Sequence, residues 1–260
     1  MSKKVFSIIT PTYNVENKLE RTIKSVLNQK NDLFEYIIID SNSEDNTLNI
    51  IKKYKNLLLW ISEKDEGIYF AFNKGIDISK GKYLYFLGAG DVLRNGILEI
   101  VTKTIDKTNA DIVYGNVFFN SKNKIYNGKY NRYKIMDSNI CHQSIFYKKS
   151  IFEKYGKFDT KYSVLADYAF NIMCFGKNSL KKEYINYVIA TYEGCGLSSR
   201  QEDKVFSNDL TGIIKENLGY QYFFVYNLYN PRRQIVFFLK KVKLYYFVKH
   251  FIKMLNKLIH

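Results

Sequence analysis

The regular alternation of strand-like and helix-like segments in residues 1–91 constrains the fold more than any other feature. Short runs of apolar and β-branched residues, which are typical of strands, are separated by segments such as 16–29, where apolar residues recur at three-to-four spacing. This alternation predicts an α/β fold with a mostly parallel sheet and helices on its faces. The predicted strands are 5–9, 34–40, 57–61 and 83–87.

Polar or acidic residues follow each of these predicted strands. Pro11 cannot donate to a strand ladder, so we expect the first strand to end before it and a loop to begin there. In open parallel sheets, ligands bind beyond the carboxyl ends of the strands. We therefore expect four side chains to converge there, namely Tyr13, Asp40, Asp65 and Asp91.

The second half of the chain shows weaker patterns. Apolar spacing and turn residues still separate its elements, and the character of the sequence changes near Tyr220, where we place a domain edge. The predicted elements are a helix at 97–108, a strand at 110–119, a hairpin or loop at 121–132, a strand at 141–147 and a helix within 159–177.

The net charge of +15 is concentrated near the C-terminal end of the sequence. No Asp or Glu follows Glu216, and apolar residues at helical spacing run beside lysines in this region. The pattern predicts a basic amphipathic helical tail over 221–260 that binds an anionic membrane surface. The alternative is a helix that packs on the rest of the protein with its lysines in water. Because the charge is local and no basic-aromatic nucleic-acid motif is present, we expect no nucleic-acid partner.

Cysteine usage and the absence of targeting signals bear on the compartment. Three scattered cysteines without a CxxC pair predict no disulfide framework and a reducing compartment. We find no leader pattern and no apolar run long enough for a spanning helix. Together with the basic tail, these features predict a cytoplasmic protein that is peripheral on the inner face of the cell membrane.

Three motifs in order carry a resemblance to a known family. They are Ser7-Ile-Ile-Thr-Pro-Thr-Tyr-Asn14, Ile38-Ile-Asp-Ser-Asn-Ser-Glu-Asp-Asn-Thr47 and the stretch 63–91 with its Gly67-Ile-Tyr69 and Asn73-Lys-Gly75. The set resembles the family 2 glycosyltransferases of the bacterial surface-polysaccharide type, which are inverting enzymes with the GT-A fold.

The resemblance covers roughly residues 4 to 200 and implies a sugar transfer. The donor would be a UDP-sugar or another nucleotide-sugar, and the acceptor a lipid-linked glycan or surface polysaccharide. It implies a GT-A domain over 1–220, divided into a nucleotide-sugar-binding half, 1–120, and an acceptor half, 121–220, followed by a C-terminal helical extension. The alternative is a catalytically weak, transferase-like binding subunit of a glycan-assembly complex.

The resemblance also implies a donor site. Pro11, Thr12 and Tyr13 would line the nucleobase, and Asp40 would accept a hydrogen bond from an N–H such as that of uracil. Asp40 could alternatively cap the next helix. The further residues assigned to the nucleotide-sugar are Asp65, Gly67, Asn73 and Gly90.

Asp91 ends the segment that matches the metal-binding acidic motif of the family. The motif reads Gly88-Ala89-Gly90-Asp91 here, so only its last carboxylate is present. Mn²⁺ or Mg²⁺ needs few protein carboxylates when a diphosphate supplies other oxygens. We therefore expect metal binding through Asp91, weaker than in relatives with an acidic pair.

An inverting transfer needs a base that takes the proton of the acceptor hydroxyl. Asp167 matches the acid in the late helix of the family and is the lone acid in an apolar segment. Its alternative role is a helix cap, and Glu193 is the reserve candidate for the base. His142 and Gln143 resemble a pair at the acceptor or phosphate side of the cleft, although a lone histidine on a strand is often structural.

Overall fold

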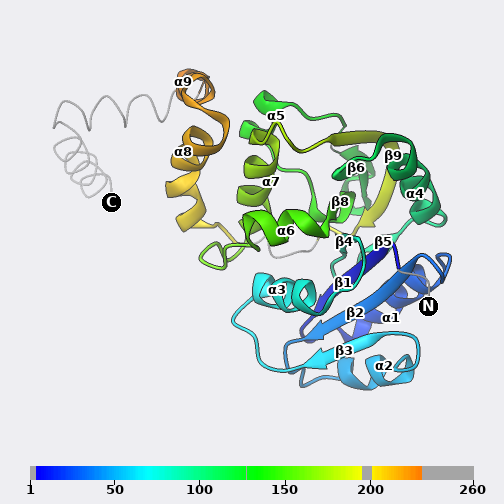
Figure 1. Ribbon diagram of the computed structural model, residues 1–260. Helices are drawn as coiled ribbons and strands as arrows, with labels where there is room; N and C mark the ends of the chain where they lie inside the picture. The colour runs from blue at the N-terminus through cyan, green and yellow to red at the C-terminus, as the bar shows by residue number, and fades with distance from the viewer. Residues whose placement is uncertain (1–3, 127, 195–200, 230–260) are drawn as a thin grey trace, which may run out of the picture.

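The computed structural model describes residues 4–126, 128–194 and 201–229. A mixed sheet with strand order β3-β2-β1-β4-β8-β6-β9-β5 runs through the molecule, and β7 pairs with β6 (Figure 1). The strands are β1 (Phe6–Thr12), β2 (Phe34–Asp40), β3 (Leu59–Ser62), β4 (Tyr83–Phe86), β5 (Val92–Leu93), β6 (Ile112–Phe119), β7 (Lys124–Tyr126), β8 (Ile145–Lys148) and β9 (Lys182–Tyr192).

The first half of the sheet is parallel, as the alternation predicts. β1 pairs in parallel with β2 and β4, and β2 pairs in parallel with β3. β8 then joins the two halves by antiparallel pairing with β4 and β6. Because β8 runs antiparallel to β4, the first residue of β8 lies beside the carboxyl end of β4. Residues 142–144, which precede β8, therefore lie next to Asp91.

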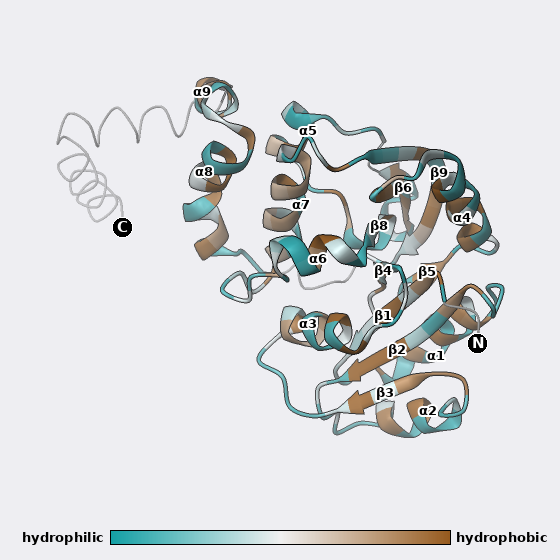
Figure 2. Ribbon diagram, in the orientation of Figure 1, coloured by the Kyte–Doolittle hydropathy of each residue, from teal (hydrophilic) through white to brown (hydrophobic). Residues whose placement is uncertain are grey.

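Helices cover both faces of this sheet (Figure 1). Strands covered on both faces are mostly apolar along their whole length, and Figure 2 shows mainly hydrophobic residues in β1 to β3. The helices are α1 (Glu16–Leu27), α2 (Thr47–Lys53), α3 (Ile68–Ile78), α4 (Ile97–Thr108), α5 (Arg132–Asp137), α6 (Lys149–Tyr155), α7 (Ala166–Gly176), α8 (Lys204–Leu218) and α9 (Tyr220–Tyr229), with short 3₁₀ turns at Asn120–Lys122 and His142–Ser144.

Successive side chains of β1 enter two different cores. Ile8 joins a cluster with buried residues of α1 and α4, whereas Ile9 joins a cluster with buried residues of α3, α7 and α8. This alternation follows from the period of two along a strand. The α/β architecture predicted from the sequence is thus confirmed.

The structure corrects the predicted end of the first strand. β1 continues through Pro11, which pairs with Ile39, as far as Thr12. The pairing of β1 with β4 ends at Ile9, so beyond it β2 is the one described strand that pairs with β1. Proline is tolerated there because its missing N–H leaves no ladder bond broken on the open side.

The predicted strand at 141–147 is also corrected. Residues His142–Ser144 form a 3₁₀ turn, and β8 begins only at Ile145. The Ser144 backbone N–H and hydroxyl both donate to the carbonyl of Cys141, which closes the turn. His142 and Gln143 therefore lie in a turn and not in a strand.

The domain edge near Tyr220 lies between two helices. α8 buries Phe206, Leu210, Ile214 and Leu218 in the core shared with α7, and α9 then packs on α8 and α5. No helix within the described residues is both long and apolar enough to span a membrane. The basic residues of the predicted tail lie in 230–260, outside the described residues, so the division of the chain into 1–220 and 221–260 stays a prediction.

Candidate active site

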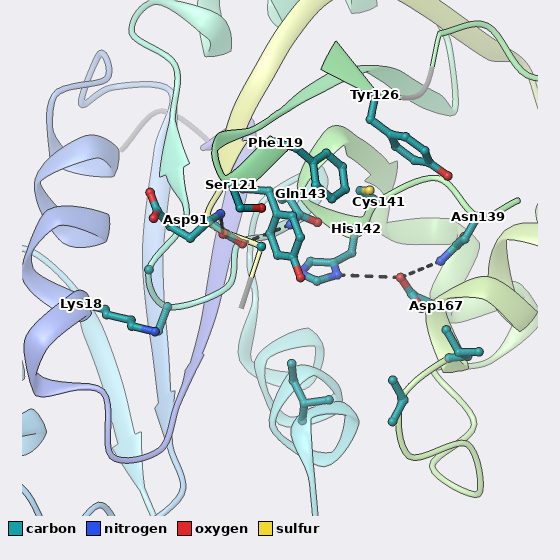
Figure 3. Close-up of a pocket in the computed structure, with 18 of the residues that line it drawn as sticks. Lys18, Asp91, Phe119, Ser121, Tyr126, Asn139, Cys141, His142, Gln143 and Asp167 are labelled. Carbon is teal, nitrogen blue, oxygen red and sulfur yellow. Dashed lines mark hydrogen bonds and ion pairs between the residues drawn. The ribbon is translucent and has the colours of Figure 1, made fainter. Parts of the chain in front are cut away.

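A pocket of about 390 Å³ opens where β4, β6 and β9 end and α7 begins (Figure 3). It brings together residues that lie far apart in the sequence. Six of the residues singled out above line it, namely Gly90, Asp91, His142, Gln143, Asp167 and Glu193.

The loop after β4 is held against helix α1. Thr22 accepts a hydrogen bond from the Gly90 N–H (2.8 Å) and donates one to the Asp91 carbonyl (2.9 Å). Gly90 has φ +105°, a conformation that favours glycine. A side chain there would also approach Lys18 and Arg21 of α1. The loop therefore presents Asp91 to the pocket in one fixed position.

Asp91 is a buried carboxylate, only 6 % exposed. One oxygen accepts from Gln143 Nε2 (3.2 Å) and the other from the Glu193 backbone N–H (3.3 Å). Burial raises the pKa of Asp91 to about 6, although the nearby His142 counteracts part of this rise. A cation beside Asp91 would favour the charged form and reverse the cost of burial.

Asp167 lies in the first turn of α7, 4 % exposed, with its carboxylate held by donors from three segments. It accepts hydrogen bonds from the Tyr69 hydroxyl of α3 (2.8 Å), the Asn139 side-chain amide (3.1 Å) and the backbone N–H of Tyr168 (2.8 Å). Position N-cap of α7 is Leu165, and no side chain caps this helix. Asp167 is therefore not the N-cap residue, although its carboxylate accepts one backbone N–H of the first turn, that of Tyr168.

His142 lies between these two carboxylates (Figure 3). Its Nδ1 is 3.8 Å from an oxygen of Asp167, and its ring packs edge-on against Phe72. Its Nε2 is buried and has no hydrogen-bond partner among the described residues. This nitrogen lies on the Gly88 side of the ring.

Glu193, the reserve candidate for the base, forms an ion pair. Its carboxylate lies 3.1 Å from an Arg21 nitrogen, and Asn120 donates to the same group. Its backbone N–H, as described above, holds Asp91. Glu193 therefore ties the end of β9 to α1 and to the Asp91 loop.

The residues predicted to bind the nucleobase lie outside this pocket. Tyr13 is 60 % exposed at the end of β1, next to Pro11 and Thr12. Of the four side chains expected to converge, only Asp91 lines the pocket. β4 lies on the opposite side of β1 from β2 and β3, so Asp91 faces β8 rather than the strands that carry Asp40 and Asp65.

Asp40 is fully buried and saturated with hydrogen bonds. Its two oxygens accept four bonds, from the Thr12 hydroxyl (2.9 Å), the Ser43 N–H (3.0 Å) and hydroxyl (2.5 Å), and the Ser62 hydroxyl (2.7 Å). A carboxylate offers about four acceptor positions, so none is left for a base N–H in this state. Asp40 here orders the loop after β2 and does not cap α2, whose first N–H, that of Thr47, bonds to Asp45.

Asp65 and Asn73 also make internal contacts. Asp65 lies 2.5 Å from Lys74, which also contacts Glu63 (2.7 Å), so the charge of Lys74 is paired. Asn73 bonds to both the N–H and the carbonyl of Phe158, a structural link between α3 and the loop after α6. Gly67 is the N-cap residue of α3, which begins at Ile68.

Several pocket residues were not predicted from the sequence. Tyr69 stood in the Gly67-Ile68-Tyr69 motif, but its hydroxyl bond to Asp167 depends on a contact between residues 98 positions apart. Asn139, by contrast, lies in a stretch without any pattern. The remaining unpredicted residues that line the pocket include Lys18, Phe119, Ser121, Tyr126, Cys141 and Tyr192.

Comparisons with known proteins agree with this fold. The family model described as "Glycosyl transferase family 2" matches residues 7–182. A PGL/p-HBAD biosynthesis glycosyltransferase of Mycobacterium tuberculosis is 36 % identical over 214 residues, 79 % of this chain and 84 % of the relative. The poly(ribitol-phosphate) beta-N-acetylglucosaminyltransferase TarP of Staphylococcus aureus is 33 % identical over 244 residues, 86 % of this chain and 70 % of that protein.

The fold is shared with a solved structure as well. The crystal structure of S. aureus TarS 1-349 in complex with UDP-GlcNAc superposes with a TM-score of 0.62 at 16 % identity, covering 82 % of this chain and 71 % of that one. This likeness shows the GT-A fold. With the family model spanning more than half of the chain, it follows that this protein is a member of the family 2 glycosyltransferases.

Proposed function

We propose that this glycosyltransferase moves a sugar from a UDP-sugar to a lipid-linked glycan or surface-polysaccharide acceptor, with inversion and with assistance from a divalent metal. The observation that carries the proposal is that two buried carboxylates from distant segments, Asp91 and Asp167, face one pocket. The UDP-GlcNAc complex of TarS and the activity named for TarP support a UDP-sugar donor.

In this mechanism Asp167 takes the proton from the acceptor hydroxyl as that oxygen attacks the anomeric carbon. Attack from the side opposite the leaving UDP inverts the configuration at that carbon. The bonds from Tyr69 and Asn139 fix the carboxylate, so little reorganisation is needed when the acceptor arrives.

The residues around Asp91 fit a cation that the donor diphosphate largely coordinates. Within the described ranges, no group of three or more His, Cys, Asp or Glu side chains could hold a metal by itself. Asp91 is buried, its pKa is raised, and its bonds from Gln143 and Glu193 are long, so its oxygens can serve Mn²⁺ or Mg²⁺. The metal would offset the charge that develops on the leaving diphosphate.

His142 and Gln143 would act at the phosphate end of the same site. Gln143 orients Asp91, and we assign the unpartnered Nε2 of His142 as a donor to a phosphate or sugar oxygen. The nucleobase would lie over Pro11, Thr12 and Tyr13, whose exposed ring is available for stacking. For the base N–H to reach Asp40, one of the internal hydroxyl bonds of that carboxylate would have to be given up.

The second candidate is a catalytically weak binding subunit, which Ala89 favours because it stands where relatives carry another acid. Titration of UDP with and without Mn²⁺, followed by an assay of UDP-GlcNAc hydrolysis, separates the two. We expect metal-dependent UDP binding and slow hydrolysis, both reduced by Asp91→Ala but not by Asp77→Ala, a solvent-exposed carboxylate paired with Lys157. Binding without any hydrolysis would favour the subunit, and no UDP binding would refute the donor site.

We also propose that the basic tail over 221–260 holds the enzyme on an anionic membrane surface, at the cytoplasmic face where lipid-linked acceptors are presented. The charge distribution of the sequence supports this, because eight Lys and Arg residues and no acid follow Glu216.

A further inference from the structure

Three aromatic side chains form one side of the pocket. Phe119, Tyr126 and Tyr192 lie at the ends of β6, β7 and β9 and all line it. The Phe119 ring meets Tyr126 at 5.2 Å and Tyr192 at 4.9 Å between ring centroids, both edge to face. We call these three residues the aromatic wall. None of the chemistry assigned to Asp91 or Asp167 requires it.

Tyr126 presents its ring rather than its hydroxyl. The residue is 37 % exposed, yet burial raises the pKa of its phenol. Its hydroxyl interacts with the side chains of Tyr130 and Ser138, which leaves the ring as the part that lines the pocket. Exposure of an aromatic ring to water is unfavourable, so an apolar surface that covers the ring is bound favourably.

Polar groups lie beside this ring. Figure 3 shows Tyr126 and Asn139 on the Asp167 side of the pocket, whereas Asp91 and Lys18 lie on the other side. Asn139 already bonds to Asp167, and Ser121, in the turn that joins β6 to β7, lines the pocket nearer Asp91 (Figure 3). The site thus offers an aromatic face next to amide, hydroxyl and carboxylate groups.

This combination matches the chemistry of a pyranose ring. The C–H groups on one face of a pyranose are apolar and slightly positive, and the face of an aromatic ring is slightly negative. The hydroxyls around the rim of the sugar need hydrogen-bond partners. An acyclic polyol lacks the flat C–H face, and a phosphate would gain nothing from the ring.

We propose that the aromatic wall is the acceptor subsite and takes a pyranose, whose C–H face packs on Tyr126 while one hydroxyl reaches Asp167. This inference rests on the proposed function, since it takes Asp91 as the diphosphate side and Asp167 as the base. Given that division, the Asp167 side is where an acceptor must enter. The acceptor is therefore a glycan that ends in a pyranose ring.

Transfer from UDP-GlcNAc to a panel of methyl hexopyranosides tests the proposal, with glycerol and ribitol as acyclic acceptors. Methyl glycosides are used because they carry no aromatic group that could stack by itself. Tyr126→Ala should raise the acceptor KM about tenfold, which corresponds to about 1.4 kcal/mol of binding free energy. Tyr126→Phe should keep the acceptor KM within about twofold of the wild type, because it retains the ring. Ile125→Ala is the matched control, since Ile125 is 55 % exposed on the same strand and does not line the pocket.

UDP-GlcNAc hydrolysis by water reports the donor site separately. It should be unchanged in Tyr126→Ala, and its absence in the wild type would contradict the proposed function instead of the acceptor subsite. With hydrolysis intact, three results would overturn the subsite: no transfer to any pyranoside, an unchanged KM in Tyr126→Ala, or equal losses in Tyr126→Ala and Ile125→Ala. Preference for ribitol or glycerol over the pyranosides would likewise overturn it.

Discussion

At the scale of single residues, the pocket depends on carboxylates that are buried yet differently supported. Asp167 is surrounded by donors from α3, the segment before β8 and its own helix. Within the described residues, the carboxylate of Asp91 accepts two long bonds, and its pKa is raised. The bonds to Asp167 suit a proton acceptor that is held in place. The environment of Asp91 suits a carboxylate whose charged form is stabilised when a cation binds.

Replacing the base should separate chemistry from binding. Asp167→Asn keeps the size of the side chain but cannot take a proton, so we expect transfer to fall by at least about 100-fold. UDP affinity should stay within about twofold, because the substitution lies on the acceptor side. Steady-state kinetics and calorimetric titration measure the two quantities. Wild-type turnover in this variant would assign the base to another residue.

Asp91 should make stability depend on pH. A carboxyl whose pKa rises from its ordinary value of 3.8 to about 6 on folding binds its proton more tightly in the native state. Stability from this group is therefore present at low pH and is lost as the pH rises from about 4 to about 6.

Asp91→Asn removes this dependence, and the variant should be more stable than the wild type at pH 7.5 by up to about 3 kcal/mol, but not at pH 4. Urea unfolding of both proteins in EDTA at the two pH values gives the difference. An equal difference at both pH values would contradict the raised pKa. The variant should also lose UDP affinity, which is the cost of removing a functional but destabilising charge.

At the scale of elements, the acceptor side of the pocket depends on how α7 packs on α8. Gly176 ends α7, and a Cβ there would lie 2.0 Å from the backbone oxygen of Asn217 in α8. α7 carries Asp167 at its other end, and α8 buries Phe206 against Tyr168. The glycine thus lets two backbones approach and sets the position of the helix that carries the base.

Gly176→Ala should therefore destabilise the protein by about 1–3 kcal/mol, because backbone atoms must move apart. Gly212 of α8 is the control, since nothing lies within 4 Å of a Cβ built there. Gly212→Ala should stabilise by about 0.5–1 kcal/mol through helix propensity. Thermal and urea unfolding measure both. The same sign for the two substitutions would show that close packing at Gly176 does not matter.

At the scale of the whole molecule, the cluster of basic residues and the pocket lie in different parts of the chain. The pocket lies in the described core, whereas the basic residues that follow Glu216 lie in 230–260. Before them, α9 carries three exposed apolar residues at four-residue spacing, Tyr220, Phe224 and Leu228. This stripe lies on α9, the helix that directly precedes the tail residues 230–260 in the sequence (Figure 1).

Removing residues 232–260 should release the enzyme from vesicles that contain anionic lipid, as measured by co-sedimentation. Each lysine near such a surface contributes about 1 kcal/mol, so the full chain should bind strongly at low salt and weakly at about 0.5 M salt. Neutral phosphatidylcholine vesicles provide the comparison. A truncated protein that still sediments with anionic vesicles would place the attachment elsewhere.

Local patterns determined much of this protein. The strand and helix alternation, the two-sided burial of β1, β2 and β4, and the family membership all follow from short stretches, because apolar period and turn chemistry act within a few residues. The alternation also indicated Asp91 at a strand end. Similarly, the lone acid in an apolar helix indicated Asp167.

Only the tertiary structure decided which of these residues share a site. β8 runs antiparallel to β4, which sets His142 between Asp91 and Asp167 and leaves Asp40 on the other side of β1. Tyr69, Asn139 and the aromatic wall join the pocket through contacts across distant segments. No local pattern encodes such contacts, because they arise from strand order and helix packing and not from the propensities of neighbouring residues.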